Sequence, residues 1–444
     1  MDYKQLADDL VKSCLKKGAD AAEVYLQSAR NLSIEVRNGN LETVEEAASQ
    51  GVGFRVFVKG RMAFSNCNDL RQASLDNAIA RAIEFAGITT ADENNVLPDD
   101  KAMTSIEGLY DEAIAKVAMD RKIEMAREIE KLAMKDPRVR KSAGAGYSES
   151  ETEIFISNSN GISKNYKSSS CSLGVSVVAE KGEQKSSGGE SCRRRFFADL
   201  DPAEQIAARA AARAIDMLDP RMVKTQRAAV VFDPDAASAV LGGMLSAIDG
   251  ERVLQGASFL GSRLNQKIAS HLVTLIDDAT RPRGLASRPF DGEGVPTGRR
   301  VIVDTGVLKG FMYNVIAAKR AGVRSTGNAS RGGFSSLPGI GPHSFYMAAG
   351  SASADDIVKS TKVGLLLRGV TGYGINPVSG DFSGGASGHW IENGRIAFPV
   401  KGLTIAATAA DMLNGIDMVA SNLDLNRTTT APTFRIREMQ IGGE

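Results

Sequence analysis

The segment from Gly380 to Gly394 gathers several side chains that could do chemistry. Asp381, Ser383 and His389 lie within it, together with the only tryptophan of the chain. An acid, a hydroxyl and an imidazole are the residue types of a nucleophilic triad, but a triad is defined by geometry and not by closeness in sequence. No G-x-S-x-G turn presents a serine of this segment at a strand-to-helix junction. The sequence therefore assigns no catalytic residue here.

The glycines of the same segment favour binding. Without a Cβ atom, Gly384 and Gly385 let the backbone approach a ligand closely. Asn393-Gly394 between apolar residues predicts a hairpin with a type I′ turn. An exposed, glycine-rich strand edge in such a hairpin suits an extended peptide bound by strand addition. We therefore predict a peptide groove lined by Asp381, Ser383, Gly384, Gly385 and His389.

The three histidines give no indication of a metal site. His271, His343 and His389 lie far apart in the sequence, and a zinc site needs three or four converging His, Cys, Asp or Glu ligands. We expect His271 to flank a strand, His343 to lie in a surface loop and His389 to have a structural role. No Walker A run and no complete dinucleotide fingerprint occurs. The sequence therefore predicts no metal and no nucleotide cofactor on this chain.

Composition is that of a soluble globular protein. The chain has 444 residues, 43% of them hydrophobic, and a net charge of +1, so two or three domains with large cores are expected. Near-neutral charge predicts no nucleic-acid partner, and we expect Arg193–Arg195 to be a solvated strand or loop end. No stretch approaches the roughly 20 apolar residues that span a bilayer. Four cysteines without C-x-x-C spacing fit a reducing compartment, so we expect a cytoplasmic protein with no membrane partner.

The elements that position these residues begin with an α+β unit over residues 1–105. Apolar residues at helical spacing predict two helices, and Gly18 is placed to end the first. Lys59-Gly60 predicts a hairpin turn. The expected elements are a helix over 3–14, extended runs at 22–26 and 33–37, a hairpin over 51–65 and a helix over 75–86.

The same order recurs over residues 106–221, so we predict a duplicated unit. A strand that ends at Lys181-Gly182 echoes the earlier strand that ends at Lys59-Gly60. Asp201 is expected to be the N-cap of the last helix, with Pro202 in its first turn. The expected elements are a helix around 123–132, strands at 142–147, 153–157 and 172–179, and a helix up to 218.

The remaining residues, 222–444, read as a β-rich, barrel-like domain with a few helices. A buried strand at 228–232 leads into a helix whose apolar positions run to Ile248. Short β runs at glycine-punctuated intervals follow, and these are typical of a curved, barrel-like domain. The predicted fold class is α+β, with duplicated N-terminal units followed by this domain.

Five motifs spread along the chain resemble the TldD/PmbA family, and they keep its order and spacing. The resemblance implies the duplicated α+β region and β-rich domain described above. It also implies a protein described as a modulator of DNA gyrase and similar to a two-subunit, zinc-dependent peptidase that acts on unstructured peptides such as microcin leaders and antitoxins. The motifs are Phe290–Thr297, Gly306–Phe311, Ser325–Ala329, Ser379–Gly388 and Arg437–Gly443.

Within that family, the chain resembles the PmbA (TldE) branch. The TldD-type subunit carries H-E-x-x-x-H on a helix and a late cysteine as zinc ligands. The corresponding helix here, 240–248, has neither histidine nor glutamate, and the last cysteine is Cys192. The tail that matches the late cysteine reads Asn426–Thr430. The resemblance thus implies a subunit without zinc ligands, and without them no metal-activated water is available.

Three functions follow as alternatives. The favoured one is a non-catalytic subunit that completes the peptide channel of a TldD-type partner, with zinc expected on that partner. The second is a peptidase that acts alone or as a homodimer through Asp381, Ser383 and His389. The third is a regulatory protein that acts on gyrase without proteolysis. Family membership favours dimerisation through the N-terminal region.

Overall fold

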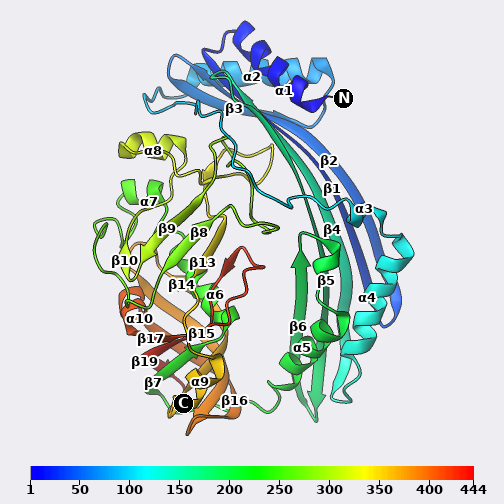
Figure 1. Ribbon diagram of the computed structural model, residues 1–444, viewed down its shortest axis with the longest axis vertical. Helices are drawn as coiled ribbons and strands as arrows, with labels where there is room; N and C mark the ends of the chain where they lie inside the picture. The colour runs from blue at the N-terminus through cyan, green and yellow to red at the C-terminus, as the bar shows by residue number, and fades with distance from the viewer. Residues whose placement is uncertain (1) are drawn as a thin grey trace.

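The computed structural model describes residues 2–444, apart from the side chain of Tyr373. A long curved sheet with helices on its outer face forms one side of the molecule, and a β-rich C-terminal region lies against the inner side (Figure 1). Six strands make up the long sheet, and a strand barrel forms within the C-terminal region. The predicted fold class is therefore confirmed.

The first unit forms as its local signals predict, with one difference in its strands. The side chain of Asp2 caps the first helix, and Gly18 just beyond the helix has φ +109°. The two extended runs predicted at 22–26 and 33–37 are one strand, because neighbours on both sides continue its hydrogen bonding across the polar residues between them. The elements are α1 (Tyr3–Lys16), β1 (Ala21–Arg37), β2 (Asn40–Val58), β3 (Arg61–Cys67) and α2 (Gln72–Ile88).

The second unit repeats this order, and again two predicted runs are one strand, β4. Asp201 is not the N-cap of α5, since that position is held by Pro202. Asp201 instead accepts hydrogen bonds from Arg194 and Arg209, at 2.6 and 2.5 Å, so ion pairs occupy its carboxylate. The elements are α3 (Ala113–Lys116), α4 (Met119–Ala133), β4 (Val139–Asn158), β5 (Ser163–Lys181), β6 (Gln184–Arg194), η1 (Phe197–Asp199) and α5 (Ala203–Ile215).

Both units share one antiparallel sheet, in the order β3-β2-β1-β4-β5-β6. β1 and β4 pair at its centre along most of their length. The two cores stay separate, one beneath α1 and α2 and the other beneath α4 and α5. Because β1 and β4 pass both cores, Ile34 of β1 packs in the second core and Phe155 of β4 packs in the first. The boundaries at residues 105 and 221 stay a prediction.

The C-terminal region combines a closed five-stranded barrel with a second sheet around one core. Strands β16, β15, β14, β7 and β19 follow one another round the barrel, and the pairing of β16 with β19 closes it. β17 extends the barrel sheet beside β19, and the second sheet has the order β10-β9-β8-β13-β18. The barrel-like prediction is therefore confirmed.

These elements alternate along residues 226–442. The strands are β7 (Gln226–Phe232), β8 (Leu275–Asp278), β9 (Arg299–Asp304), β10 (Val307–Leu308), β11 (Ala329–Ser330), β12 (Gly339–Ile340), β13 (Ser344–Met347), β14 (Val363–Ile375), β15 (Asp381–Glu392), β16 (Arg395–Thr408), β17 (Ile416–Val419), β18 (Thr429–Thr430) and β19 (Phe434–Gly442). The helices are α6 (Pro234–Met244), α7 (Gly250–Leu254), α8 (Val315–Ala321), α9 (Ala354–Lys359) and α10 (Ala409–Gly415).

Helix α6 is shorter than the apolar spacing predicted. It ends at Met244, and the chain then turns, so that the backbone N–H of Ile248 donates to the carbonyl of Met244 at 3.2 Å. Gly242 and Gly243 are poor helix formers at the end of the helix. Ile248 is still fully buried in the C-terminal core. The prediction was right about which residues are buried and wrong about the length of the helix.

Buried cations join the sheet to the C-terminal region. Arg195 was expected to be solvated, but it is 6% exposed and donates to the backbone carbonyls of Gly284 and Leu285 at 2.7 and 2.8 Å. Lys164 likewise donates to the carbonyl of Gly294 at 2.7 Å. An arginine can satisfy several carbonyls at once, and this explains how Arg195 can be buried here. The helices of residues 2–444 include none that is long and apolar enough to cross a membrane.

Candidate functional site

The predicted groove residues lie on the barrel strand β15. Asp381 and Ser383 are exposed on the outside of the barrel, Gly384 is buried and Gly385 is half-buried. A Cβ atom at Gly384 would lie 3.0 Å from the carbonyl oxygen of Thr371, and one at Gly385 would lie 2.6 Å from the Thr371 hydroxyl. These glycines therefore allow β14 and β15 to pack closely. Their role as peptide contacts stays a prediction.

The free strand edge expected in this segment is wrong. β15 pairs with β14 on one side and with β16 on the other, over Asp381–Glu392. The predicted turn is confirmed, since Asn393 and Gly394 have φ of 51° and 73°. Because the strand uses both of its edges inside the closed barrel, residues 381–392 leave no backbone edge for strand addition.

Geometry also separates Asp381, Ser383 and His389. A rise of about 3.3 Å per residue places Ser383 and His389 roughly 20 Å apart along β15. Asp381 accepts a hydrogen bond from the hydroxyl of Ser379 at 2.6 Å. His389 lies with Nε2 2.9 Å from the carbonyl oxygen of Asp216, and burial lowers its pKa. These residues do not form a triad, and His389 instead ties the barrel to the end of α5.

His343 is buried, so its predicted place on the surface is wrong. Its Nε2 lies 2.7 Å from the carbonyl oxygen of Gly327, and its backbone N–H donates to Asp277 at 2.7 Å. Burial lowers the pKa of the imidazole to about 3, so the ring is neutral at physiological pH. The neighbouring Gly-Pro sequence did predict a loop, but the buried Asp277 carboxylate holds that loop inside.

A groove of about 1160 Å³ lies between the inner face of the long sheet and the C-terminal region. Strands β1, β4, β5 and β6 line one side of it. The start of α6 and the loop from Asn422 to Thr430 line the other side. The predicted residues on β15 are not among those that line it. We refer to this cavity as the groove.

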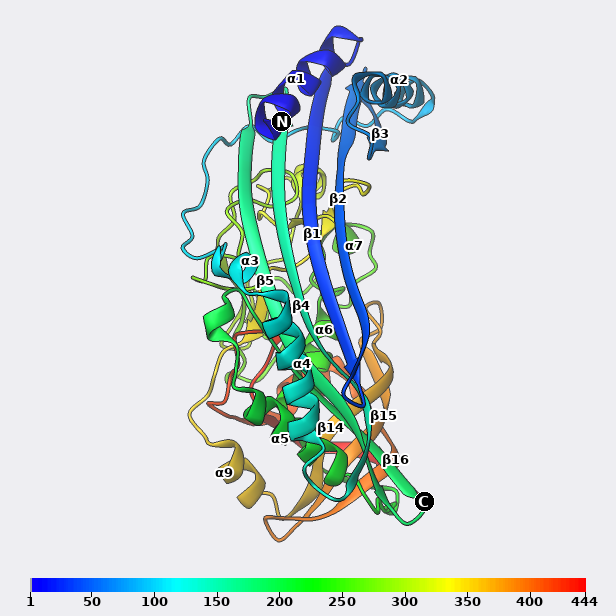
Figure 2. The same cartoon turned by 90° about the vertical axis from the view of Figure 1, so that its right-hand side faces the viewer.

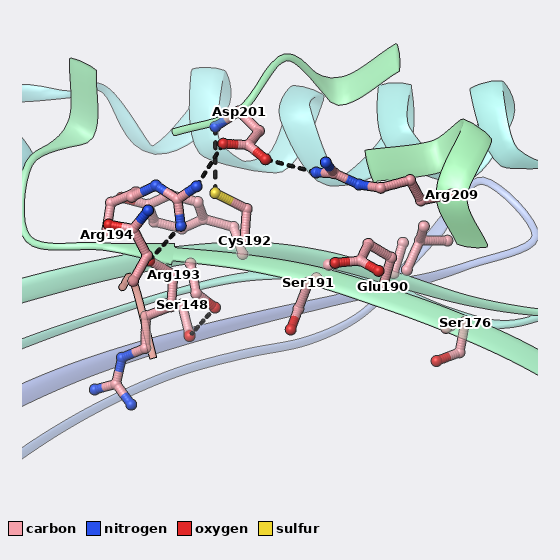
Figure 3. Close-up of a pocket in the computed structure, with 18 of the residues that line it drawn as sticks. Ser148, Ser176, Glu190, Ser191, Cys192, Arg193, Arg194, Asp201 and Arg209 are labelled. Atoms are coloured by element: carbon pink, nitrogen blue, oxygen red, sulfur yellow. Dashed lines mark hydrogen bonds and ion pairs between the residues drawn. The ribbon is translucent and has the colours of Figure 1, made fainter. Parts of the chain in front are cut away.

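Small residues alternate along the sheet side of the groove. Alternate residues of a strand share one face, and the opposite face of these strands packs against α4 and α5. In Figure 3, Ser148, Ser176 and Ser191 point away from the helices and into the groove. The sheet side therefore offers hydroxyls and accessible backbone, with few large side chains. Its members at this spacing are Gly144, Gly146, Ser148, Ser172, Gly174, Ser176, Gly189 and Ser191.

Charged side chains line the groove beside the start of α6. Asp235 pairs with Arg213 at 2.8 Å and also with Arg427, and Arg213 pairs with Glu190 at 3.0 Å. Burial favours a higher pKa for Asp235, but the two arginines outweigh it and hold that pKa below its usual range. Burial raises the pKa of Asp233, the N-cap of α6, to about 6. Asp235 is therefore charged at neutral pH, whereas Asp233 takes up a proton in mild acid.

Arg193 differs from the other arginines of the groove because it forms no ion pair among residues 2–444. Arg194 and Arg209 both pair with Asp201 (Figure 3), whereas Arg193 has no carboxylate partner within residues 2–444. Its Nε and Nη2 lie 3.3 and 2.9 Å from the hydroxyl of Ser170. Arg193 is therefore able to donate further hydrogen bonds to a carbonyl or carboxylate of a bound molecule.

The residues around α6 do not fit a zinc ion. Zinc takes three or four His, Cys, Asp or Glu ligands, and the described part of the chain has no group of three or more such side chains placed to hold a metal. Asp235 is the only acidic residue within α6, and two arginines already engage it. At Gly242 a Cβ atom would meet nothing within 4 Å, so the helix presents open space there.

Sequence reasoning missed the groove because its lining comes from segments that are far apart in the chain. Strands were predicted at 142–147 and 172–179, and alternate residues within them are small. Nothing local in the sequence indicated what lies opposite that face of small residues. The pairing of Asp235 with Arg427 joins residues separated by most of the C-terminal region, and no local pattern predicts it.

Comparison with known families and proteins agrees with these observations along the chain. The PmbA/TldA metallopeptidase domain 1 matches residues 22–86, the central domain matches 112–218 and the C-terminal domain matches 225–443. Metalloprotease PmbA of Escherichia coli O157:H7 is 28% identical over 447 residues, which cover 99% of this chain and 97% of that protein. A metalloprotease TldD homolog of Haemophilus influenzae is 25% identical and covers 96% and 94%.

Solved structures share the fold over the whole length. A candidate modulator of DNA gyrase from Bacteroides thetaiotaomicron has a TM-score of 0.92 and 29% identity, covering 100% of both chains. A second such protein, from Thermotoga maritima, has a TM-score of 0.90 and 26% identity, covering 99% of this chain and 100% of the other. With the three domains matched in order, this chain belongs to the PmbA/TldD metallopeptidase family.

Proposed function

We propose that this chain is a non-catalytic subunit of a two-subunit zinc metallopeptidase and forms part of its channel for unstructured peptides. One observation carries the proposal: the groove joins a sheet face of serine and glycine to a helix, α6, that lacks a set of metal ligands. A chain with this site binds substrate and depends on a partner for chemistry.

An extended peptide suits the groove for physical reasons. Serine hydroxyls both donate and accept hydrogen bonds, so they can serve the amides of any sequence. Glycine allows a second backbone to come close, and Arg193 offers a cation to a carbonyl or a terminal carboxylate. Asp381, Ser383, Gly384, Gly385 and His389 remain candidate contacts, which a partner subunit would have to bring beside the channel.

The proposed partner is a TldD-type subunit that supplies the zinc ion. Three or four of its own side chains would hold the metal, and the metal would activate the attacking water. A homodimer of this chain would lack those ligands as well. All four cysteines are free, which fits action in a reducing compartment, and we propose the cytoplasm.

The experiment compares this chain alone, a TldD-type subunit of the same organism alone, and the two co-expressed. Metal is counted on each by mass spectrometry, and cleavage is followed with an unstructured fluorogenic peptide. We expect a stoichiometric complex, with zinc on the partner and cleavage by the complex. Stoichiometric zinc together with cleavage by this chain alone would overturn the proposal.

The descriptions of the two solved relatives favour a second candidate, a non-proteolytic action on DNA gyrase. The purified chain is added to a gyrase supercoiling assay without any peptidase partner. A change in supercoiling that saturates with this chain would support the second candidate, and unchanged supercoiling would count against it.

A further inference from the structure

The outer side of β2 over Asn40–Gln50, here called the open edge, has no neighbouring strand in the described chain. β2 pairs with β1 over Asn40–Phe57, with one bulge at Glu42, but β3 pairs with it only over Val52–Val58. All residues of the open edge are exposed, on both faces of the sheet. Figure 2 shows β2 along one margin of the sheet, with β3 and α2 beside its upper part.

The open edge has only part of the usual protection against pairing with another chain. Natural edge strands are blunted by charged side chains, especially lysine, by proline, by bulges or by a covering element; this edge has three glutamates and one bulge, at Glu42 near its start. Residues 40–50 contain neither lysine nor proline, and Leu41 and Val44 are 41% and 43% exposed. Phe334 covers the strand only from Gly51 onward, since a Cβ atom at Gly51 would lie 2.3 Å from its ring. Unpaired backbone groups therefore meet solvent beside apolar side chains.

All charged side chains of the open edge are acidic. Glu42, Glu45 and Glu46 lie on it, with no basic residue in 40–50. Glu46 pairs with Arg30 at 2.6 Å, and Glu42 lies 3.6 Å from Arg37. Glu45 has no ion-pair partner among residues 2–444. A strand that docks here is therefore favoured if it carries a basic residue opposite Glu45.

A second copy of this chain fits the open edge poorly. In an antiparallel pairing that uses all of Asn40–Gln50, the central residue, Glu45, lies directly opposite Glu45 of the other copy. Like charges directly opposite each other destabilise a strand pair. In this register the edge repels a second copy of itself, whereas a strand with a basic residue opposite Glu45 pairs with it without that repulsion.

We propose that the open edge accepts an edge strand of the metal-binding partner subunit, with a lysine or arginine of that strand facing Glu45. This inference rests on the proposed function, because it names the surface through which the two subunits join. Strand addition would satisfy the free N–H and C=O groups of β2. It would also continue the long sheet from one subunit into the other.

Proline substitutions test the backbone part of the proposal. Successive residues of a strand direct their N–H groups to opposite neighbours. Of the two variants Ala47→Pro and Ala48→Pro, one therefore removes an N–H group that points outward, and the other removes a hydrogen bond to β1. We expect the outward variant to keep the unfolding temperature of the wild type and to weaken the complex with the TldD-type subunit at least about tenfold in Kd. The other variant is expected to lower the unfolding temperature.

Charge variants test the choice of partner. Glu45→Lys is expected to weaken the two-subunit complex about tenfold in Kd, whereas Glu45→Gln should weaken it less and increase self-association in analytical ultracentrifugation. Glu183→Lys makes the same change at an exposed hairpin turn and should leave Kd unchanged. A wild-type complex with unchanged Kd in every edge variant would overturn this inference alone. If the wild-type chain forms no complex with the TldD-type subunit, the proposed function is overturned as well. If the wild-type chain forms a homodimer that the outward proline dissociates, the occupant is a second copy, and the proposed partner is overturned.

Discussion

Arg55 and Glu293 form a buried ion pair, with Nη1 and Oε1 2.7 Å apart, between β2 and the C-terminal region. Glu23 of β1 pairs with Arg55 at 2.7 Å and also with Arg331. The second oxygen of Glu293 accepts the backbone N–H of Val315 at 2.7 Å. This network fixes the sheet to the region that lies across the groove, so it sets the separation of the two sides.

Removing the central cation should destabilise the whole chain. Arg55→Leu leaves Glu23 and Glu293 buried without their shared partner, and breaking a buried pair in this way costs about 3–5 kcal/mol. Urea unfolding followed by circular dichroism measures the loss. Arg138→Leu is the matched control, because its pair with Asp136 is exposed and should contribute little. Equal, small losses in the two variants would show that the buried network does not hold the two parts together.

Asp233 gives the stability of the chain a pH dependence. Its pKa rises from 3.8 to about 6 on folding, so the folded state holds a proton that the unfolded state has released. The stabilisation is complete below about pH 4 and is lost as pH rises through about 6, with a difference of about 2–3 kcal/mol.

Asp233→Asn isolates this dependence. Asparagine caps a helix as well as aspartate does and has no proton to lose. The variant should therefore gain stability relative to the wild type between pH 4 and pH 7, as measured by urea unfolding at each pH. A difference between the two proteins that stays constant with pH would contradict the assignment.

Local chemistry made the turns of this fold predictable, and the long strands were harder to predict. Lys59-Gly60 and Asn393-Gly394 adopt positive φ as the sequence indicated, and a type I′ turn requires positive φ at both of its central residues. The middle of β1, Ser28–Asn31, is largely polar, and in the sequence it separated two predicted strands. It crosses the gap between two separate cores, where hydrogen bonds to β2 and β4 hold it extended without apolar side chains.

The sequence indicated the type of site, one that binds peptide, but not its place in the fold. The sequence showed that α6 contains no histidine or glutamate, and it showed the glycine-rich hairpin of β15. The barrel closes through the pairing of β16 with β19, and no local sequence pattern predicts this pairing. β14 and β16 pair with the two edges of β15, including the edge that was predicted to bind peptide, and the groove forms instead where the inner, serine-rich face of the long sheet lies opposite α6.

A bulky side chain on the sheet side of the groove should obstruct peptide without disturbing the fold. Ser172→Trp projects into the groove beside Ser148, whose hydroxyl lies 3.2 Å from that of Ser172. We expect KM of the two-subunit complex for an unstructured peptide to rise about tenfold, with little change in kcat, because binding is lost and the metal is untouched. Ser351→Trp, at an exposed residue outside the groove, should leave both constants unchanged. Equal KM values in the two variants would contradict the proposal that the peptide binds in the groove.

Gly384 distinguishes packing within the barrel from contact with peptide. A valine there would bring its Cβ 3.0 Å from both Thr371 O and Val370 Cγ1, so we expect Gly384→Val to lower the free energy of unfolding by about 1–3 kcal/mol. Ser383→Val changes the exposed neighbour, where a β-branched residue suits a strand, and it should leave the unfolding temperature nearly unchanged. Thermal unfolding of both variants, with peptidase assay of their complexes, separates the two roles. A stable Gly384→Val chain whose complex has lost activity would mean that this glycine is kept for the peptide and that the barrel tolerates the larger side chain.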